Sequence, residues 1–268
     1  MKDLHIHTKY SDGEYDEYTI IEKVKNAGVK EFSVCDHDTL DGSKKVFDLV
    51  SKDRSLIYHL GVELSCRLKA FGGIDIHLLV RDYNYNDEKL KELVDKVSSF
   101  RIIKIERMVE LVRDVYGIEL SAKEVEEEAK KTKSFGKPHI YSLLQRHGNF
   151  DREEFYKNMR NLKSEDLKLD AVEVLQMMKN REGYATLAHP IEIMDEYNFD
   201  YEGIEKIVSY LVNEGLDGLE TRHSKHTEKD FREFSKIAKK YNLIETEGSD
   251  YHGPNVKPNV KIGVCIKE

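Results

Sequence analysis

The sequence predicts an α/β fold in which short strands alternate with helices, with one helical insertion interrupting the alternation. Two observations carry this prediction: the repeated switch between strand-like and helix-like runs, and the polar residues that follow the strand-like runs. The expected strands lie near 2–6, 31–35, 56–64, 74–80, 184–188, 217–221, 243–247 and 262–266, with helices at 18–27, 39–52, 201–214 and 227–241. Such alternation is typical of parallel strands joined by crossover helices, and polar residues at the carboxyl ends of strands fit a barrel with its chemistry at that end.

Residues 86–182 contain several helical periods and no convincing strand. One apolar stripe follows a 3.6-residue period up to Gly117, which is a natural helix stop; it comprises Leu90, Leu93, Val94, Val97, Ile105, Met108, Val112 and Val115. We therefore expect a barrel of residues 1–85 and 184–268 and a helical insertion, or lid, of residues 86–183. Arg101 and Lys104 fall at the centre of the stripe, where they either extend to water or offer two cations to a bound phosphate.

Composition bounds the class of protein. The chain has 268 residues, of which 39% are hydrophobic and 35% charged, so we expect a soluble globular protein with an ample core. No apolar run reaches about 18 residues and no secretory signal is evident, which makes a cytoplasmic location the default expectation and excludes a membrane partner. The three cysteines, Cys35, Cys66 and Cys265, lack CxxC spacing and are best read as small buried hydrophobes. Serine-nucleophile, P-loop and Rossmann motifs do not occur in the sequence.

The charge is unevenly distributed. The net charge of −8 argues against binding of long duplex nucleic acid. Residues 86–183 carry 20 Lys and Arg against 20 Asp and Glu, so the whole acidic excess lies in the flanking portions. Residues 130–168 are locally basic, with 10 Lys and Arg against 5 Asp and Glu. An acidic body with a locally basic insertion suits a phosphorylated substrate.

Histidine and acidic residues recur where strands end. His5 and His7 stand at i and i+2 on the first strand, so they share one face and can reach one metal ion together. Asp12 follows the strand, where a turn through Gly13 can return its carboxylate to the same ion. An isolated His-x-His pair is more often structural, but the pattern repeats at later strand ends, with His37, Glu63, His77, His189, Asp250 and His252. Nine imidazole and carboxylate groups without a thiolate suit three divalent transition-metal ions, Mn, Fe or Zn, and hydrolysis of a phosphate ester.

A second motif lies in the insertion, at Phe135-Gly136-Lys137-Pro138-His139. Proline fits the first position of a helix, and a helix N-terminus beside Lys137 suits an anion. The same residues could serve only as a helix start. Near the predicted ligands, Asp3, Asp36 and Asp38 either orient ligands through hydrogen bonds or cap strand ends and turns.

Six motifs resemble those of the PHP (polymerase and histidinol phosphatase) family. They are Asp3-Leu-His-Ile-His-Thr8, Ser11-Asp-Gly13, Asp36-His-Asp-Thr39, Gly61-Val-Glu-Leu-Ser65, Ala188-His-Pro190 and Gly248-Ser-Asp-Tyr-His-Gly253. The resemblance implies a distorted seven-stranded α/β barrel with a trinuclear site and a metal-bound hydroxide as nucleophile. It assigns His5, His7, Glu63 and Asp250 to one ion, Glu63, His77 and His189 to a second, and Asp12, His37 and His252 to a third.

Within that family the insertion looks most like the stand-alone phosphoesterases that act on nucleotides or short RNA. This implies substrate contacts from Arg101, Lys104, Lys137, His139, Ser224 and His226, of which His226 is also a candidate for protonating the leaving group. The chain has Lys137 where that branch has Arg, and Glu247 adds a carboxylate that could repel substrate or orient a ligand. Histidinol-phosphate phosphatase and a non-enzymatic, polymerase-associated metal-binding module are the alternatives. The sequence leaves open the substrate, the native metal, the oligomeric state and the direction of any exonuclease action.

Overall fold

The computed structural model describes residues 1–129, 137–160, 162, 167–263 and 265–266. The chain divides into two compact units, which we call unit 1 (residues 1–91 and 169–268) and unit 2 (residues 92–168). The position of one unit relative to the other is not determined. Each is therefore described by itself.

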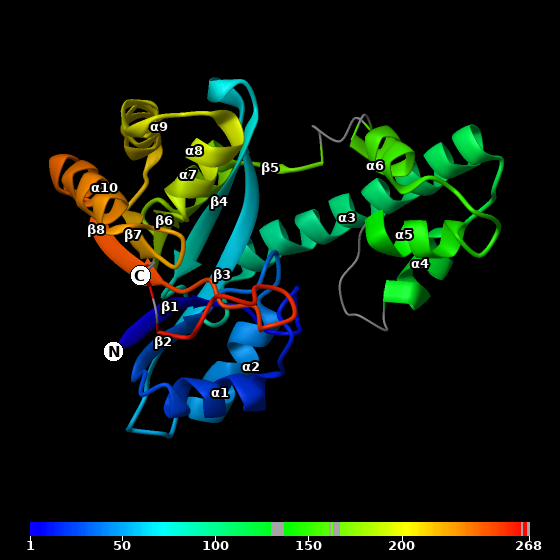
Figure 1. Cartoon of the computed structure of the whole chain (residues 1–268). Helices are drawn as coiled ribbons and strands as arrows, with labels where there is room; N and C mark the ends of the chain where they lie inside the picture. The colour runs from blue at the N-terminus through cyan, green and yellow to red at the C-terminus, as the bar shows by residue number, and fades with distance from the viewer. Residues whose placement is uncertain (130–136, 161, 163–166, 264, 267–268) are drawn as a thin grey trace. The chain divides into compact units, whose positions relative to one another are not determined.

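Unit 1 is built on a nearly closed mixed sheet (Figure 1). Its seven main strands follow the order β1-β2-β3-β4-β6-β7-β8, and a short strand, β5, pairs with β3 outside this path. The bounds are β1 Lys2–Ile6, β2 Glu31–Val34, β3 Ile57–Leu68, β4 Ile74–Arg81, β5 Leu169–Asp170, β6 Tyr184–Leu187, β7 Gly218–His223 and β8 Ile244–Gly248. A parallel bridge between Ile6 and Tyr251 brings the two ends of the sheet together, with the His7 amide 2.9 Å from the Tyr251 carbonyl. This is the expected distorted seven-stranded barrel.

The expectation of parallel strands throughout is wrong at β4, which runs antiparallel to both β3 and β6. Only a short 3₁₀ turn, Lys69–Phe71, joins β3 to β4, and a parallel connection needs a longer crossover. The strand expected at 262–266 is also wrong: Ile262 and Gly263 form a turn, and the described residues there join no sheet. Barrel closure instead uses the segment directly after β8.

Helices cover the outside of the unit 1 sheet (Figure 1). They are α1 Glu17–Asn26, α2 Asp41–Val50, α7 Ala171–Met178, α8 Pro190–Tyr197, α9 Tyr201–Glu214 and α10 Glu228–Lys240. Local sequence sets where they begin: the Asp16 and Asp200 side chains each accept a hydrogen bond from a first-turn amide, and Thr227 forms a capping box with Asp230. Beneath α1 and α2 lies an apolar core that includes Ile6, Ile20, Val24, Phe32, Val34 and Val46.

Helices are the only regular secondary structure among the described residues of unit 2. They are most of α3 (Glu88–Tyr116), which starts in unit 1, then α4 Ala122–Ala129, α5 Lys137–Leu144 and α6 Arg152–Arg160. Their shared core is apolar and includes Met108, Val112, Val125, Ile140, Leu144 and Phe155. No described helix of the protein has both the length and the apolar character that a membrane span requires.

Candidate metal centre

The strands of unit 1 deliver the nine predicted ligands to one place. His5 lies on β1 and His7 just beyond it, Glu63 lies within β3, and His77 lies on β4 opposite Ser65 of β3. A parallel bridge joins His37 to Glu63. His189 follows β6, while Asp250 and His252 follow β8. Residues up to 247 positions apart in the sequence thus converge. Most of them follow the carboxyl ends of parallel strands, while Glu63 lies inside β3 and His77 lies on the antiparallel strand beside it.

Three groups of potential ligand atoms occur in this place, each with its atoms within 4.8 Å of one another. One group is His5, His7, Glu63 and Asp250; another is His7, Asp12, His37 and His252; the third is His37, Glu63 and His77. The remaining predicted ligand, His189, has its Nε2 2.9 Å from Oε1 of Glu63. All nine predicted ligands therefore belong to one cluster, in which His7, His37 and Glu63 are each shared by two groups.

Glu63 is the centre of this cluster. Its Oε1 lies 2.9 Å from Nδ1 of His77, and its Oε2 lies 3.0 Å from Nε2 of His5 and 3.1 Å from Nε2 of His7. Yet His7 Nε2 and His37 Nδ1 are buried without a hydrogen-bond partner. Ring nitrogens that approach a carboxylate closely without forming hydrogen bonds are placed as ligands of a common cation would be. The residues present therefore fit divalent metal ions with nitrogen and oxygen ligands.

Electrostatics keeps the carboxylates of the cluster ionised. Burial alone would raise the pKa of Glu63, but the imidazoles of His37 and His5 hold this pKa well below its usual range. Burial lowers the pKa of His7, but the nearby carboxylates of Asp250 and Glu63 outweigh it and raise this pKa to about 9. Burial lowers the pKa of His37 to about 3. A metal ion bound here would take the place of the proton that the acids hold on His7.

The backbone is held in uncommon conformations at the cluster. His189 and Asp250 both have positive φ angles, 23° and 58°, in a region of backbone conformation that residues other than glycine rarely adopt. Next to Asp250, a Cβ on Gly248 would come within 2.2 Å of the Cβ of His5, so only glycine allows β8 to approach β1 this closely. Both features lie where the ligands meet.

Two of the three aspartates flagged in the sequence hold the ligand-bearing loops. Asp36 accepts hydrogen bonds from the amide and hydroxyl of Thr8 (2.7 and 2.6 Å) and from the hydroxyl of Ser11 (2.7 Å), which fixes the loop leading to Asp12. Asp3 accepts hydrogen bonds from the amides of Ser249 and Gly263, both at 2.8 Å. Asp38 accepts one from the amide of Ser65 at 2.9 Å.

Sequence reasoning missed Glu220 on β7, which is fully buried behind the cluster. Its Oε1 lies 3.1 Å from Nδ1 of His5, and its Oε2 accepts a hydrogen bond from the His189 amide at 2.8 Å. An ionised carboxylate can only accept, so Nδ1 of His5 carries a proton, which leaves Nε2 as the ring atom that would bind a metal ion beside Glu63. The only sequence signal was an acidic residue inside an expected strand.

As groups that hold metal ligands, Glu192, His223 and Lys257 were also missed. Oε2 of Glu192 lies 3.4 Å from Nδ1 of His189, and its other oxygen pairs with Lys225. Nε2 of His223 lies 3.3 Å from Oδ2 of Asp250, with which Lys257 also pairs. None of these three residues stands at a motif position, so spacing alone gave no signal for them.

The substrate residues expected from unit 1 lie behind or beside the cluster. His226 is buried against Phe234, and its Nδ1 donates to the Thr221 carbonyl at 2.9 Å. Burial lowers the pKa of His226 to about 4, so at neutral pH its unpartnered Nε2 is an acceptor. Ser224 is half-buried in the turn after β7. Glu247 alternates with Gly248 along β8, so it faces away from His5 and lines a separate cavity of about 190 Å³ with Arg222 and Phe231.

The substrate residues expected from the insertion lie in unit 2. Arg101 and Lys104 are on α3, while Lys137 and His139 are in the first turn of α5. Phe135 and Gly136, which precede Lys137 in the expected anion motif, lie outside the described residues. The distance from these four residues to the cluster is not determined, because each unit is placed only by itself. Their contact with a substrate stays a prediction.

The barrel and its clustered ligands define a class of protein, the metal-dependent hydrolases of phosphate esters. The PHP domain family matches residues 3–248, and this chain belongs to that family. It is 25% identical to the phosphoribosyl 1,2-cyclic phosphate 1,2-diphosphodiesterase of Eggerthella lenta, over 94% of each chain. It is 23% identical to a 5'-3' exoribonuclease of Haemophilus influenzae, over 94% of this chain and 90% of the relative.

Solved structures support the fold. A metal-dependent phosphoesterase from Bifidobacterium adolescentis, so described, matches with a TM-score of 0.71 and 24% identity, over 100% of this chain and 92% of that chain. An amidohydrolase from Chromobacterium violaceum, with bound sulfate and no metal, matches with a TM-score of 0.72 and 19% identity, over 97% and 89%. The chain is thus a PHP-family phosphoesterase with a fold shared along its whole length.

Proposed function

We propose that this protein hydrolyses a phosphate ester of a small nucleotide, such as a 3',5'-bisphosphonucleotide, or of the end of a short oligonucleotide. The observation that carries the proposal is the convergence of nine nitrogen and oxygen ligands around the Glu63 carboxylate, with buried ring nitrogens that lack hydrogen-bond partners. The names of the two relatives, a phosphoribosyl cyclic phosphodiesterase and an exoribonuclease, support the nucleotide class.

The proposed cofactor is a set of three divalent ions, Mn, Fe or Zn. His5, His7, Glu63 and Asp250 would hold one, Glu63, His77 and His189 a second, and Asp12, His37 and His252 the third. When bound, such ions lower the pKa of water and neutralise charge that develops on phosphate oxygens. The grouping of His7 with Asp12, His37 and His252 is compatible with this assignment, because Nδ1 of His7 lies 3.6 Å from Asp12 while its Nε2 lies 3.1 Å from Glu63, so Nε2 is left for the first ion.

The chain's own side chains would orient these ligands and bind the substrate. Glu220 sets the tautomer of His5, and Asp36 fixes the loop that carries Asp12. We assign binding of the phosphorylated substrate to Arg101, Lys104, Lys137, His139, Ser224 and His226. Since Nε2 of neutral His226 is an acceptor, it would receive a hydrogen bond from substrate, and it would need to gain a proton before it could protonate a leaving group.

A substrate panel with Mn-loaded protein tests this function. The panel contains adenosine 3',5'-bisphosphate, 5'-phosphorylated short RNA, a ribose 1,2-cyclic phosphate and histidinol phosphate, with chelator-treated protein as the control. We expect release of phosphate or nucleotide from at least one of the first three substrates. Preferential turnover of histidinol phosphate would favour the alternative phosphatase. Failure to hydrolyse any of the four would refute the proposal, and a metal content near zero would return the chain to the non-enzymatic class.

A substitution at Lys137 tests whether this residue binds the substrate or the metal. Lys137→Ala is expected to raise KM or lower kcat by roughly tenfold, the scale of one lost charge-assisted contact, while the metal content stays unchanged. Lys123→Ala, at an exposed lysine of α4 in the same unit, is the matched control and should leave both constants unchanged. Loss of metal from the Lys137 variant would contradict its assignment to the substrate.

A further inference from the structure

The two oxygens of the Asp250 carboxylate face different partners. Oδ1 faces the cluster, 3.3 Å from Nε2 of His7 and 3.7 Å from Nε2 of His5. Oδ2 faces away from it, where Nε2 of His223 lies at 3.3 Å and the Lys257 ammonium forms an ion pair. Oδ1 is therefore available to a metal ion, while Oδ2 is held by two neighbouring side chains, which we call the holding side.

The tautomer of His223 makes it a donor to Asp250. The backbone amide of Lys225 donates a hydrogen bond to Nδ1 of His223 at 3.2 Å, so Nδ1 carries no proton. The ring proton of neutral His223 is therefore on Nε2, which faces Oδ2 of Asp250. Both groups on the holding side, the His223 ring and the Lys257 ammonium, donate to the same oxygen.

An organised loop carries Lys257 to this position. The Lys257 amide donates to the Gly253 carbonyl at 2.8 Å, and the Val260 amide donates to the Lys257 carbonyl at 3.1 Å. The Asn255 side chain donates to Glu14 at 2.8 Å, which ties the loop to the segment after Asp12. Gly253 has a φ of 104°, and a Cβ there would come within 2.5 Å of Glu14. The side chain of Lys257 is 27% exposed, so it reaches from the surface into the cluster.

We propose that Lys257 is a positioning residue that acts on the metal centre through Asp250, an inference that rests on the proposed ligation by Asp250. With Oδ2 occupied by two donors, the carboxylate cannot rotate freely and Oδ1 alone is presented to an ion beside His5 and His7. The ammonium also has an opposite effect, because its positive charge repels a nearby metal ion. If positioning dominates, removal of the ammonium weakens metal binding; if repulsion dominates, removal strengthens it.

Equilibrium dialysis of the full chain against Mn²⁺, with elemental analysis, shows whether positioning or repulsion dominates. For Lys257→Met we expect the dissociation constant of about one ion per chain to rise by roughly 10- to 100-fold, the usual effect of losing a group that orients a metal ligand. Lys257→Arg keeps a donor and a positive charge, and should restore binding to within about threefold of the unsubstituted chain. Thermal unfolding without metal checks that the Met variant folds.

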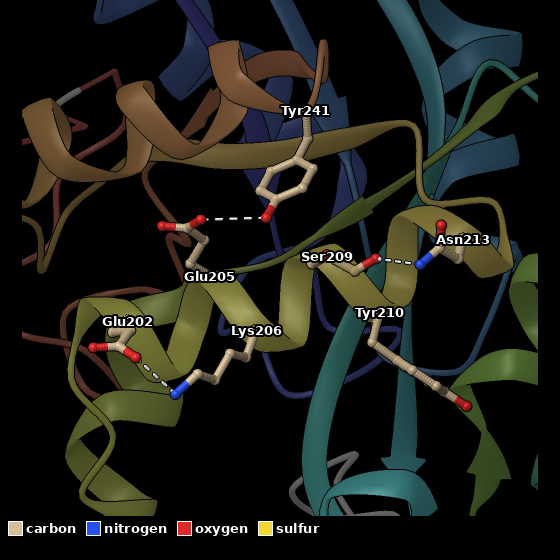
Figure 2. A pocket seen from close by; sticks show the side chains of 7 residues that line it. All are labelled: Glu202, Glu205, Lys206, Ser209, Tyr210, Asn213 and Tyr241. Atoms are coloured by element: carbon tan, nitrogen blue, oxygen red, sulfur yellow. Dashed lines mark hydrogen bonds and ion pairs between the residues drawn. The ribbon is translucent and has the colours of Figure 1, made fainter.

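Lys206→Met is the matched control. Lys206 pairs with Glu202 at 2.8 Å on the outer surface of α9, beside a hollow of about 490 Å³ that contains none of the nine predicted ligands (Figure 2). Its Mn²⁺ binding should not change. Unchanged or tighter Mn²⁺ binding by Lys257→Met, with a raised KM, would overturn the proposal and make Lys257 a substrate cation.

The dialysis separates this proposal from the proposed function. If the unsubstituted chain binds Mn²⁺ but hydrolyses nothing in the panel, the substrate assignment falls and the Lys257 result still stands. If the unsubstituted chain binds no Mn²⁺, both the metal centre and the positioning role are overturned.

Discussion

Units 1 and 2 bury different kinds of side chain. Among the described residues, every buried polar or charged side chain lies in unit 1, including His5, His7, Glu63, Glu220 and Asp250. The core of unit 2 is apolar. Unit 2 is thus stabilised as an ordinary helical domain is, by removing apolar surface from water.

The difference shows where the protein gives up stability for function. Burying an ionised group costs several kcal/mol unless partners compensate for the lost hydration. The acids that unit 1 nevertheless buries include Glu63, Glu220 and Asp250, whose pKa values are all lowered by neighbouring imidazoles. Such an arrangement persists where a cation completes it, so the buried charge of unit 1 marks the candidate metal centre.

The largest expected effect comes from Glu63, whose carboxylate is shared by two of the three groups of ligands. Glu63→Gln should lower kcat on the order of 10⁴-fold, because bound ions account for several kcal/mol of transition-state stabilisation. The metal content should fall with it. Glu245→Gln, at an exposed position on β8, is the control. Full Mn²⁺ content in the Glu63 variant, measured by elemental analysis, would show that the carboxylate is not a shared ligand.

The next largest effect tests whether the two units are stabilised separately. Phe155 is fully buried in the core of unit 2 against Tyr116 and Tyr141. Phe155→Ala should destabilise unit 2 by about 3–5 kcal/mol through lost burial and a cavity. Hydrogen exchange should show the loss in unit 2, with Mn²⁺ content unchanged. Ile102→Ala, at a residue 57% exposed on α3, should change little. Loss of metal on Phe155→Ala would contradict the separation.

A smaller effect is expected at Glu220, which contacts the ligands without facing the proposed ions. Glu220→Gln should weaken Mn²⁺ binding by about 10- to 100-fold. Its amide can donate to Nδ1 of His5, which moves the imidazole proton to Nε2, where a metal ion would bind. Glu245→Gln again serves as the control. Isothermal titration with Mn²⁺ measures the change, and unaltered affinity would mean that the tautomer of His5 is fixed by other groups.

Most of the fold could be predicted because its signals are local. Alternating strand and helix periods located β1, β2, β6, β7 and β8, and the helix expected at 201–214 has the same bounds in the structure. The parallel direction expected for β4 was wrong, although fewer than ten residues separate β3 from β4, too few for a crossover helix. The length of the connection carried information that the alternation did not.

In the candidate site, too, some residues could be predicted from local sequence signals and others could not. Residues of the six motifs, such as His5 and Glu63, were found because motif spacing reports them directly. Glu220 and Lys257 were missed because their role depends on a neighbour more than 200 positions away for Glu220, and on a loop conformation for Lys257. Tautomers, carboxylate orientation and the approach of β8 at Gly248 are properties of packing, which no local pattern encodes.

The smallest expected effect concerns a feature that the two units share, a helix start held by an acid. In unit 1, Asp16 accepts the Thr19 amide at 3.0 Å, and this hydrogen bond lowers its pKa to about 2. In unit 2, Glu124 accepts the amide and hydroxyl of Ser121 at 2.8 and 2.7 Å, which lowers its pKa. Because the pKa of each acid is lower in the folded chain, its contribution is present above the unfolded value of about 4 and is lost as pH falls through the folded value.

Asp16→Asn and Glu124→Gln should therefore each cost less than about 1 kcal/mol at pH 7, since both acids are at the surface. For Asp16 the difference from the unsubstituted chain should shrink between about pH 4 and pH 2. Hydrogen exchange of α1 and α4 at a series of pH values measures both. If acid removes far more stability from α4 than from α1, the two units differ at their surfaces as well as in their cores. The difference between them would then extend beyond the charged groups that only unit 1 buries.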